Sequence, residues 1–376
     1  MEIVFWVGAG LVGYAYVGYP ALLWLWACLT PAPPPAGDIT PRVSIIVAAY
    51  NEAGYIEDKL RNALAQDYPR EALEVIAVSD GSDDGTADIA RGIDDDRLRV
   101  IELPRGGKAR ALNAALAAAS GEIVVFTDAN VFFDPDAVRR LAGHFAAPDC
   151  GAVTGLVELV AMESSEPLGE GAYMRYERFL QEREARIATM IGTDGALFAA
   201  RRALLGPLPP EIILDDFWIA ARIADQGYAV RYDHRARGFE WVPAAVAQEF
   251  RRKVRIAAGG FQVLPHLGFL RHPLRRPTLS LFFVSHKLLR WLAPFPLLAL
   301  FISSALLANQ PLYLAAFCAQ LAFYLLAGLG ATARRARRFT LVYTPYYFAA
   351  LNAALLVGLL RYLGGRQSAL WRRVSR

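Results

Sequence analysis

The sequence predicts an α/β protein in which an open, parallel sheet lies between segments that cross a membrane. From residue 42 to about residue 250, short β-branched runs alternate with charged helical stretches, the pattern of βα units around a buried sheet. On both sides of this region lie long apolar runs. The whole chain is 55% hydrophobic and 20% charged, which is too apolar for a disordered chain and indicates membrane contact.

The first apolar run predicts an N-terminal transmembrane helix within residues 1–30. Residues 3–29 carry no charged side chain and exceed the ~20 residues needed to cross a bilayer. A cleavable signal peptide is the alternative, but this run begins Met1-Glu2 and is longer than the ~7–15-residue apolar core of such peptides. The proline-rich residues 31–41 that follow predict a stiff, extended linker.

The central region, residues 42–250, predicts one water-soluble domain. Right-handed crossovers would place its strands in one sheet whose carboxyl ends form the ligand crevice. The expected strands are Val43–Ala48, Leu73–Val78, Leu98–Leu103 and Glu122–Thr127. The expected helices are Gly54–Gln66, Thr86–Arg91, Lys108–Ala119 and Pro135–Phe145.

The C-terminal third predicts further membrane segments. Residues 251–278 hold an apolar stretch bracketed by arginines, as in helices that lie along an anionic membrane surface. Within residues 279–363, three charge-free runs are long enough to span; they are 291–308, 311–333 and 339–360. The positive-inside rule then predicts a multi-pass protein of the inner (plasma) membrane with a cytosolic domain and a cytosolic loop at 334–338. The same count puts the basic tail, residues 364–376, outside, which the rule disfavours.

Composition excludes several other classes. The three cysteines (Cys28, Cys150 and Cys318) form no CxxC pair, so neither a disulfide framework nor a zinc site is expected. The net charge is only +4 and the arginines gather at predicted membrane edges, which argues against a nucleic-acid partner. The spans carry no charge, which argues against an ion-coupled transporter. The sequence leaves a protein partner open.

Acidic residues follow two of the predicted strands. Asp80 ends the second strand and Asp128 ends the fourth, so both carboxylates should meet in the crevice. There they can hold a divalent cation or accept hydrogen bonds from a nucleobase and a ribose. Asp83 and Asp84 lie in a Gly- and Ser-rich stretch and are interpreted as turn or helix-capping residues.

Other charged residues have two interpretations each. Lys108 follows two glycines at the start of an Ala-rich helix; without Walker spacing the signal is weak, but beside two acids it favours phosphate contact. Asp215 and Asp216 precede an amphipathic helix and could cap it or supply a general base. Arg251 and Arg252 could form a solvated or lipid-facing cluster or bind a diphosphate.

Seven segments, in order, resemble the membrane-bound inverting glycosyltransferases of family 2. This group includes the cellulose, chitin, hyaluronan and poly-N-acetylglucosamine synthases. The resemblance covers residues 43–255. The segments are VSIIVAAYNE (43–52), SDGSDDGT (79–86), GGKARALN (106–113), FTDAN (126–130), GTDGALFAARR (192–202), LDDF (214–217) and QEFRRKVR (248–255).

The resemblance implies a GT-A-type, Rossmann-like catalytic domain that uses a nucleotide diphosphate sugar, foremost a UDP-sugar, with Mg²⁺ or Mn²⁺. The acceptor would be a hydroxyl of a growing polysaccharide or oligosaccharide. The alternative is a single transfer to a lipid acceptor such as a polyprenyl phosphate, ceramide or diacylglycerol. The expected partners are the nucleotide sugar donor, a carbohydrate or lipid-linked acceptor and the lipid bilayer. From another class, a transporter or inactive scaffold with this fold would show no divalent-dependent donor hydrolysis.

The resemblance also implies roles for individual residues. Asp216 would be the base that takes the proton of the acceptor hydroxyl, with Asp215 as its acidic neighbour, and Asp128 with Asn130 would hold the metal. Arg252 stands where the QxxRW motif of the synthases has a Trp that bounds the acceptor. The donor-binding residues would be Ala49, Tyr50, Glu52, Asp80, Lys108, Asp128, Arg251 and Arg252, and the acceptor-binding residues Asp194, Gly195 and Gln248.

Overall fold

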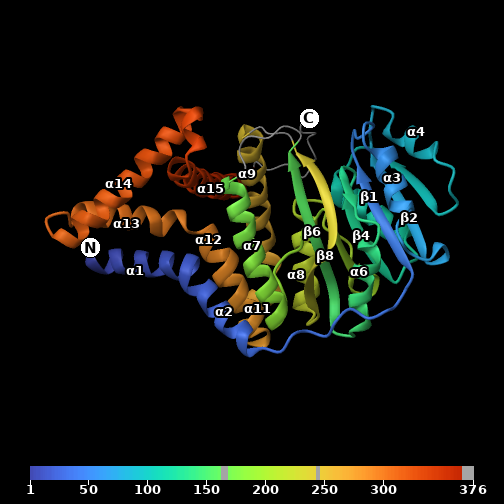
Figure 1. Ribbon diagram of the computed structural model, residues 1–376, viewed down its shortest axis with the longest axis horizontal. Coiled ribbons are helices and arrows are strands. Elements are labelled where there is room, and N and C mark those ends of the chain that lie inside the picture. The colour runs from blue at the N-terminus through green and yellow to red at the C-terminus, as the bar shows by residue number, and fades with distance from the viewer. Residues whose placement is uncertain (162–167, 243–245, 366–376) are drawn as a thin grey trace.

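The computed structural model describes residues 1–161, 168–242 and 246–365. Figure 1 shows two regions, a sheet with its covering helices and a group of helices that projects from it. The polypeptide begins in the projecting helices, forms the sheet, and returns to the projecting helices near its end.

The sheet has eight strands in the order β3-β2-β1-β4-β7-β6-β8-β5. The first four strands in sequence pair in parallel, as predicted. The other half is mixed: β6 and β8 pair in parallel, but the prediction of a parallel sheet is wrong for β7, which runs antiparallel to β4 and β6, and for β5, which runs antiparallel to β8. The strands are β1 (Val43–Ala49), β2 (Leu73–Asp80), β3 (Leu98–Leu103), β4 (Ile123–Asp128), β5 (Val131–Phe133), β6 (Cys150–Ala161), β7 (Phe198–Arg201) and β8 (Ala229–Val242).

Helices cover both faces of the sheet, which explains why β1 is apolar at nearly every position. Ile46 and Ala48 belong to the core on one face, whereas Ile45 and Val47 belong to the core on the other. The predicted helices are found within two residues at each end. The helices of this region are α3 (Ile56–Leu64), η2 (Arg70–Ala72), α4 (Thr86–Arg91), α5 (Lys108–Ala118), α6 (Ala137–Gly143), η3 (His144–Ala146), α7 (Leu168–Ile187), η4 (Arg202–Leu204) and α8 (Asp215–Asp225).

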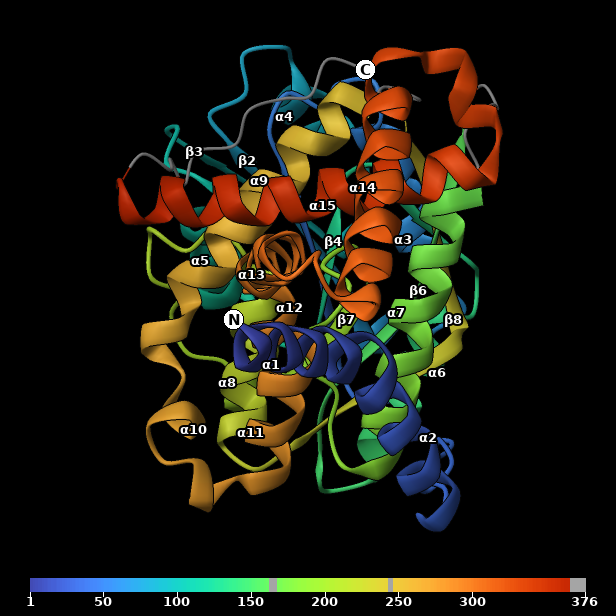
Figure 2. The same cartoon turned by 90° about the vertical axis from the view of Figure 1, so that its left-hand side faces the viewer.

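The projecting region is entirely helical. Its N-terminal part, Glu2–Leu29, is one long helix with a π-helical turn at Tyr14–Gly18. Figure 2 looks onto this region and shows the helices in front of the sheet. The elements are α1 (Glu2–Gly13), η1 (Tyr14–Gly18), α2 (Tyr19–Leu29), α9 (Val246–Val263), η5 (Leu264–His266), α10 (Gly268–Arg271), η6 (Pro273–Arg275), α11 (Pro277–Phe282), η7 (Phe283–Leu288), α12 (Leu289–Trp291), α13 (Pro294–Leu306), α14 (Pro311–Thr332), η8 (Arg334–Arg338) and α15 (Thr340–Leu363).

By length and composition, three described helices could cross a membrane: Glu2–Leu29, Pro311–Thr332 and Thr340–Leu363. The predicted span 291–308 forms a helix of only 13 residues, Pro294–Leu306, which is ~20 Å long. It passes the same test only together with Pro277–Trp291, from which it is bent by 58°. Prolines at the start of α13 cannot continue the preceding helix, which accounts for this break.

Candidate active site

The carboxylate of Asp80 organises the loop that leads into α5. Asp80 ends β2 and is fully buried. It accepts hydrogen bonds from the backbone N–H groups of Gly106 (2.7 Å) and Gly107 (2.8 Å) and from the Arg105 guanidinium (2.7 Å). Gly107 has a φ of +94°, a conformation that favours glycine. Asp80 therefore fixes the loop from which Lys108 extends.

The segments after β1 and β2 hold each other through side-chain hydrogen bonds. Asp83 accepts a hydrogen bond from the Asn51 amide at 2.7 Å, and Asn51 has a φ of 55°. The Asp84 carboxylate accepts from the backbone N–H groups of Ala53 and Thr86, both at 3.1 Å. These bonds are the ones that the turn interpretation of Asp83 and Asp84 predicts.

The predicted donor residues of the first segment lie at the end of β1. Ala49 is buried and pairs with Ser79 of β2. The ring of Tyr50 lies under the Arg105 guanidinium, whose carbon is 3.2 Å from the ring centroid. The backbone N–H of Glu52 donates to the Thr86 hydroxyl at 2.9 Å. Ala49, Tyr50 and Glu52 therefore adjoin the loops that carry Asp80 and Lys108.

Lys108 joins the acids of two distant segments. Its Nζ lies 2.9 Å from Asp128 Oδ1 at the end of β4 and 3.1 Å from Asp215 Oδ2 at the start of α8. Burial disfavours the ammonium, yet the two carboxylates raise the pKa of Lys108 above its ordinary value. The structure thus brings together three residues that the sequence assigned to one site.

Asp216 has a different environment from Asp215. Burial, and then the charge of Asp215, raise the pKa of Asp216 to about 7, and Lys108 partly offsets them. The carboxylate lies against Gly195, where an added Cβ would be 3.0 Å from Asp216 Oδ2. A carboxyl group with a pKa near neutrality can act as a general base.

Asp194 and Glu240 add negative charge near Asp128. Burial raises the pKa of Asp194 to about 6, and Glu240 and Asp128 contribute to the shift. Asn130 is buried and donates its amide hydrogen to Glu240 at 3.0 Å. Sequence analysis missed Glu240 because it lies on β8, and none of the seven motif segments includes that strand.

The acids fit a divalent cation only in part. Among the residues that the structure describes, no three His, Cys, Asp or Glu side chains gather as a metal site. The Asp128 side chain is 41% exposed, and other carboxylates lie near it. Magnesium sites of this kind use one or two carboxylates together with substrate phosphates. Asp128 would then be the metal ligand from the protein, and the phosphates of the donor would supply further ligands.

Helix α9 supplies cations on the other side of these acids. Arg252 is close enough to Asp194 to lower its pKa, and both Arg251 and Arg252 are exposed. The side chain of Gln248 lies outside the described residues. Burial lowers the pKa of Arg255, and the charges of Asp215, Asp128 and Asp216 oppose this shift. Arg255 was not among the predicted site residues, although its spacing from Arg252 places both on one side of a helix.

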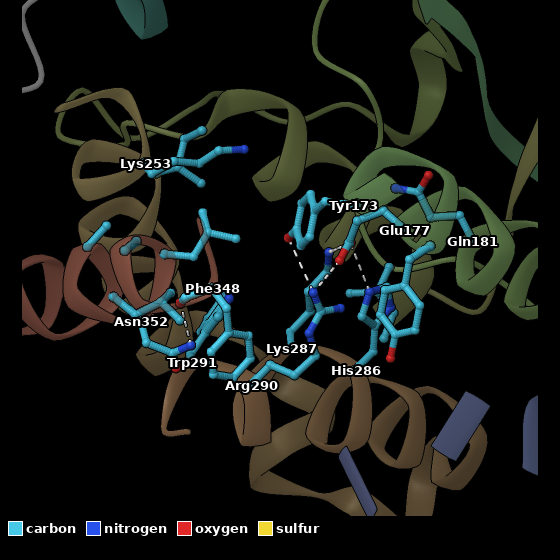
Figure 3. A pocket seen from close by; sticks show the side chains of 18 of the residues that line it. Tyr173, Glu177, Gln181, Lys253, His286, Lys287, Arg290, Trp291, Phe348 and Asn352 are labelled. Atoms are coloured by element: carbon cyan, nitrogen blue, oxygen red, sulfur yellow. Dashed lines mark hydrogen bonds and ion pairs between the residues drawn. The ribbon is translucent and has the colours of Figure 1, made fainter. Parts of the chain in front are cut away.

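A cavity of about 530 Å³ opens beside Asp216, between the sheet domain and the projecting helices. Helices α7, α9, α12 and α15 line it. Figure 3 shows that Glu177 on α7 points toward Arg290, Lys287 and His286. Glu177 pairs with the His286 ring at 3.1 Å, with Lys287 at 3.4 Å, and with Arg290. Sequence reasoning missed this cluster because its members are separated by more than a hundred residues.

The cavity also has aromatic and amide walls. Trp291 packs edge-on against Phe217, with ring centroids 6.0 Å apart, next to Asp216. Arg290 and Asn352 are buried and line the cavity, and one nitrogen of Arg290 and the amide oxygen of Asn352 make no hydrogen bond with the described residues. Such groups can bind a polar ligand.

Comparison with known proteins agrees with this geometry. Residues 44–205 match the model of glycosyl transferase family 2. The poly-beta-1,6-N-acetyl-D-glucosamine synthase of Staphylococcus aureus (strain MSSA476) is 30% identical over 231 residues, which are 59% of this chain and 55% of that protein. The synthase of Staphylococcus epidermidis (strain ATCC 35984) is 31% identical over 232 residues, with the same coverage. The chain thus spans about half the length of the curated relatives it matches.

One solved structure covers nearly the whole chain. The mannosyltransferase PcManGT from Pyrobaculum calidifontis, in complex with GDP-Man and Mn²⁺, is 26% identical with a TM-score of 0.72. The match covers 97% of this chain and 100% of that one, so it includes the projecting helices as well as the sheet. Residues 44–205 therefore match the family 2 glycosyltransferase model, and the sheet with its helices has a GT-A fold.

Proposed function

We propose that this protein is a membrane-embedded, metal-dependent, inverting glycosyltransferase that moves a sugar from a nucleotide diphosphate sugar to an acceptor hydroxyl. The observation that carries the proposal is the arrangement around Lys108. This cation bridges Asp128 and Asp215, while Asp216, with a pKa raised to about 7, lies next to them and faces the cavity.

The two sides of Asp216 would bind different substrates. The nucleotide would lie near Tyr50 and Asp80, with its diphosphate toward Lys108. The acceptor would enter from the cavity, which has Asp216 in its wall. Donor and acceptor would then meet from opposite directions, the geometry that inversion by a single displacement requires.

In the reaction, Asp216 would take the proton of the acceptor hydroxyl as its oxygen forms a bond to the anomeric carbon. The bond from that carbon to the diphosphate oxygen breaks at the same time, and the diphosphate leaves with the electron pair. Lys108 would stabilise the negative charge that grows on the diphosphate. A divalent cation bound at Asp128 would supply further charge neutralisation.

Polysaccharide extension is the first candidate for the acceptor reaction, because the relatives at 30–31% identity are named poly-N-acetylglucosamine synthases. The second candidate is transfer of one sugar to a lipid-linked acceptor. Two observations favour it: α15 and η1 form part of the cavity wall, and the full-length structural match is named a mannosyltransferase.

The test uses the full chain in lipid nanodiscs with labelled UDP-glucose, UDP-N-acetylglucosamine, UDP-galactose, UDP-glucuronate and GDP-mannose, each with Mn²⁺, with Mg²⁺ or with chelator. Sizing the product separates the acceptors, because a ladder indicates extension and one lipid-linked sugar indicates single transfer. The anomeric configuration of the product tests inversion. If none of these donors is consumed with either cation, the inactive-scaffold interpretation is favoured over the proposal.

Asp216→Asn tests the base. We expect at least a ~100-fold loss of transfer with donor binding retained. Asp88→Asn makes the same chemical change at a side chain that is 84% exposed on α4, and it should leave turnover unchanged. Near-normal turnover by Asp216→Asn would remove Asp216 from the proposed role.

A further inference from the structure

Helix α15 runs crosswise to α13, and α14 is oblique to α13. Figure 1 views α15 nearly along its axis, whereas Figure 2 shows it running across the picture. Helix α13 does the opposite, lying across Figure 1 and end-on in Figure 2. The two views agree that α15 runs crosswise to α13.

The other helices define the direction in which the chain crosses the bilayer. The Gln310 amide, in the turn between α13 and α14, donates to the Glu2 carboxylate at 3.2 Å. The start of α1 and this turn therefore lie together, at the end of the molecule farthest from the sheet (Figure 1). The chain runs toward the sheet domain along α1 and α2, away from it along α13, and back along α14.

One side of α15 packs closely on α9. At Gly358, an added Cβ would lie 2.5 Å from the Ala257 side chain and 3.0 Å from the Val254 carbonyl oxygen, both on α9. Helix α9 also carries Arg252 and Arg255, whose charges act on the active-site acids. Because α15 crosses α9 at this contact (Figure 2), that part of α15 is held at the level of the active site, which needs water-soluble substrates.

The other side of α15 exposes large apolar residues. Leu341, Leu360 and Leu363 are 74%, 60% and 70% exposed. A helix with one packed side and one exposed leucine side is suited to lie in the membrane interface, with the leucines among the acyl chains. The cationic segment Arg334–Arg338 directly precedes it and would meet anionic headgroups there.

The charges at both ends of α15 point to the same arrangement. If α15 crosses the bilayer, the segment Arg334–Arg338 and the four arginines of the sequence after residue 365 lie on opposite sides. If α15 lies along the surface, both cationic segments lie on the side of the catalytic domain, as the positive-inside rule favours. Four crossings would put the basic tail on the side that the positive-inside rule disfavours, and an interfacial α15 removes this conflict.

We propose that α15 does not cross the bilayer but lies in its interface on the catalytic side, where it forms part of the wall of the cavity beside Asp216. The chain then crosses three times, through α1–α2, through the bent pair Pro277–Trp291 and Pro294–Leu306, and through α14, and the end of α15 is on the side of the sheet domain. The partner of the exposed leucine side is the bilayer surface.

Spin-label depth measurements test this arrangement in the full chain. Cys28 and Cys318 are exposed and would be replaced by Ser. Single cysteines on α15 would then carry nitroxides in liposomes that contain anionic lipid, with matched sites on α14 as the control. The α15 sites are Leu341, Leu356 and Leu363, and the α14 sites are Leu312, Leu321 and Leu329.

We expect the three α15 labels to share one shallow depth. The α14 labels should pass from one interface through the centre toward the other. A deep label at Leu356, with shallow labels at Leu341 and Leu363 on opposite faces, would overturn the proposal. Because depth is measured without turnover, this result does not depend on the proposed catalytic function.

Reporter fusions at the C-terminus give a second test. With α15 in the interface, a green fluorescent protein fused after residue 376 in a bacterial host should fluoresce, and alkaline phosphatase fused there should be inactive. The reverse pair of results would place the C-terminus across the membrane and contradict the proposal. Fusions after Asn309, between α13 and α14, should give the opposite signals and serve as the control.

Discussion

Asp80 ends β2 and Asp216 lies in the first turn of α8, and their carboxylates are satisfied in different ways. Asp80 accepts hydrogen bonds from two backbone N–H groups and one guanidinium, all within 2.8 Å. Asp216 lies beside a second acid, and its pKa is raised to about 7. An acid surrounded by donors fixes the backbone, whereas an acid buried beside another is available for proton transfer. Residue type alone does not separate these two roles.

The largest effect on activity should come from removing Lys108, the cation near Asp216. Lys108→Met leaves Asp128 and Asp215 without their shared counter-charge, and breaking such a pair costs ~3–5 kcal/mol. We expect kcat/KM to fall by more than ~100-fold. We also expect the pKa of Asp216 to rise further, because Lys108 holds it down.

Steady-state kinetics over a pH range measure both effects. Lys108→Arg keeps the charge and should retain more activity than Lys108→Met. Equal activity of the two variants would show that the charge at this position does not matter.

The next effect is the pH dependence of the unmodified enzyme. Asp216 must be ionised to accept a proton, and its pKa is raised to about 7. Transfer should therefore be constant above that pH and fall about tenfold per unit below it, to roughly 1% at pH 5.

The raised pKa of Asp216 acts on folding stability in the opposite direction, because it favours the folded state at low pH. A raised carboxyl pKa means that the folded state binds the proton more tightly than the unfolded state. This contribution is present below pH ~4 and is lost as the pH rises through 7. Asp216→Asn should thus melt no lower than the unmodified protein at pH 8. A clear fall in Tm at pH 8 would show that the Asp216 charge stabilises the fold.

A smaller effect is expected from Gly195→Ala. The new methyl group would be 3.0 Å from Asp216 Oδ2 and would displace the carboxylate. We expect kcat to fall by about tenfold with the KM for the donor nearly unchanged. Gly206→Ala is the matched control, because an added Cβ there meets no atom within 4 Å. A loss confined to the donor KM would indicate that Gly195 serves the donor instead.

The smallest effect on transfer is expected from changing Asp84, which lies in the turn that follows Asp80. Asp84→Ala removes the acceptor for the backbone N–H groups of Ala53 and Thr86, at a cost of ~1–3 kcal/mol in unfolding free energy. Transfer should change only a few-fold. Thermal unfolding measures the first quantity, and Asp88→Ala, at an exposed position, controls for the loss of one charge. A loss of transfer as large as that of Lys108→Met would place Asp84 in the catalytic site.

The sequence predicted the half of the sheet that is built from consecutive βα units. Strands β1 to β4 were found because each is a short apolar run followed by a helix, a signal contained within a few dozen residues. Strands β5 to β8 pair across long separations, with irregular register between β6 and β8, and no local pattern records such pairing.

The candidate site shows the same division. Lys108, Asp128 and Asp215 were expected together because each belongs to a recognisable motif, and the structure joins them. Arg255 and Glu177 were missed because their roles depend on how distant helices pack. The length of α13 was also missed, because hydropathy detects the apolar run but not the bend that prolines introduce within it.

The paired charges of α7 have a practical consequence for anyone who wishes to prepare the catalytic half alone. Glu184 and Glu177 are buried on α7, and both contact His286, on a segment that leads into the apolar helices. A fragment trimmed at residue 276 would keep these two carboxylates and lose His286, Lys287 and Arg290. Each stranded carboxylate would cost several kcal/mol, so a detergent-free, truncated enzyme should fold poorly unless both glutamates are first made neutral.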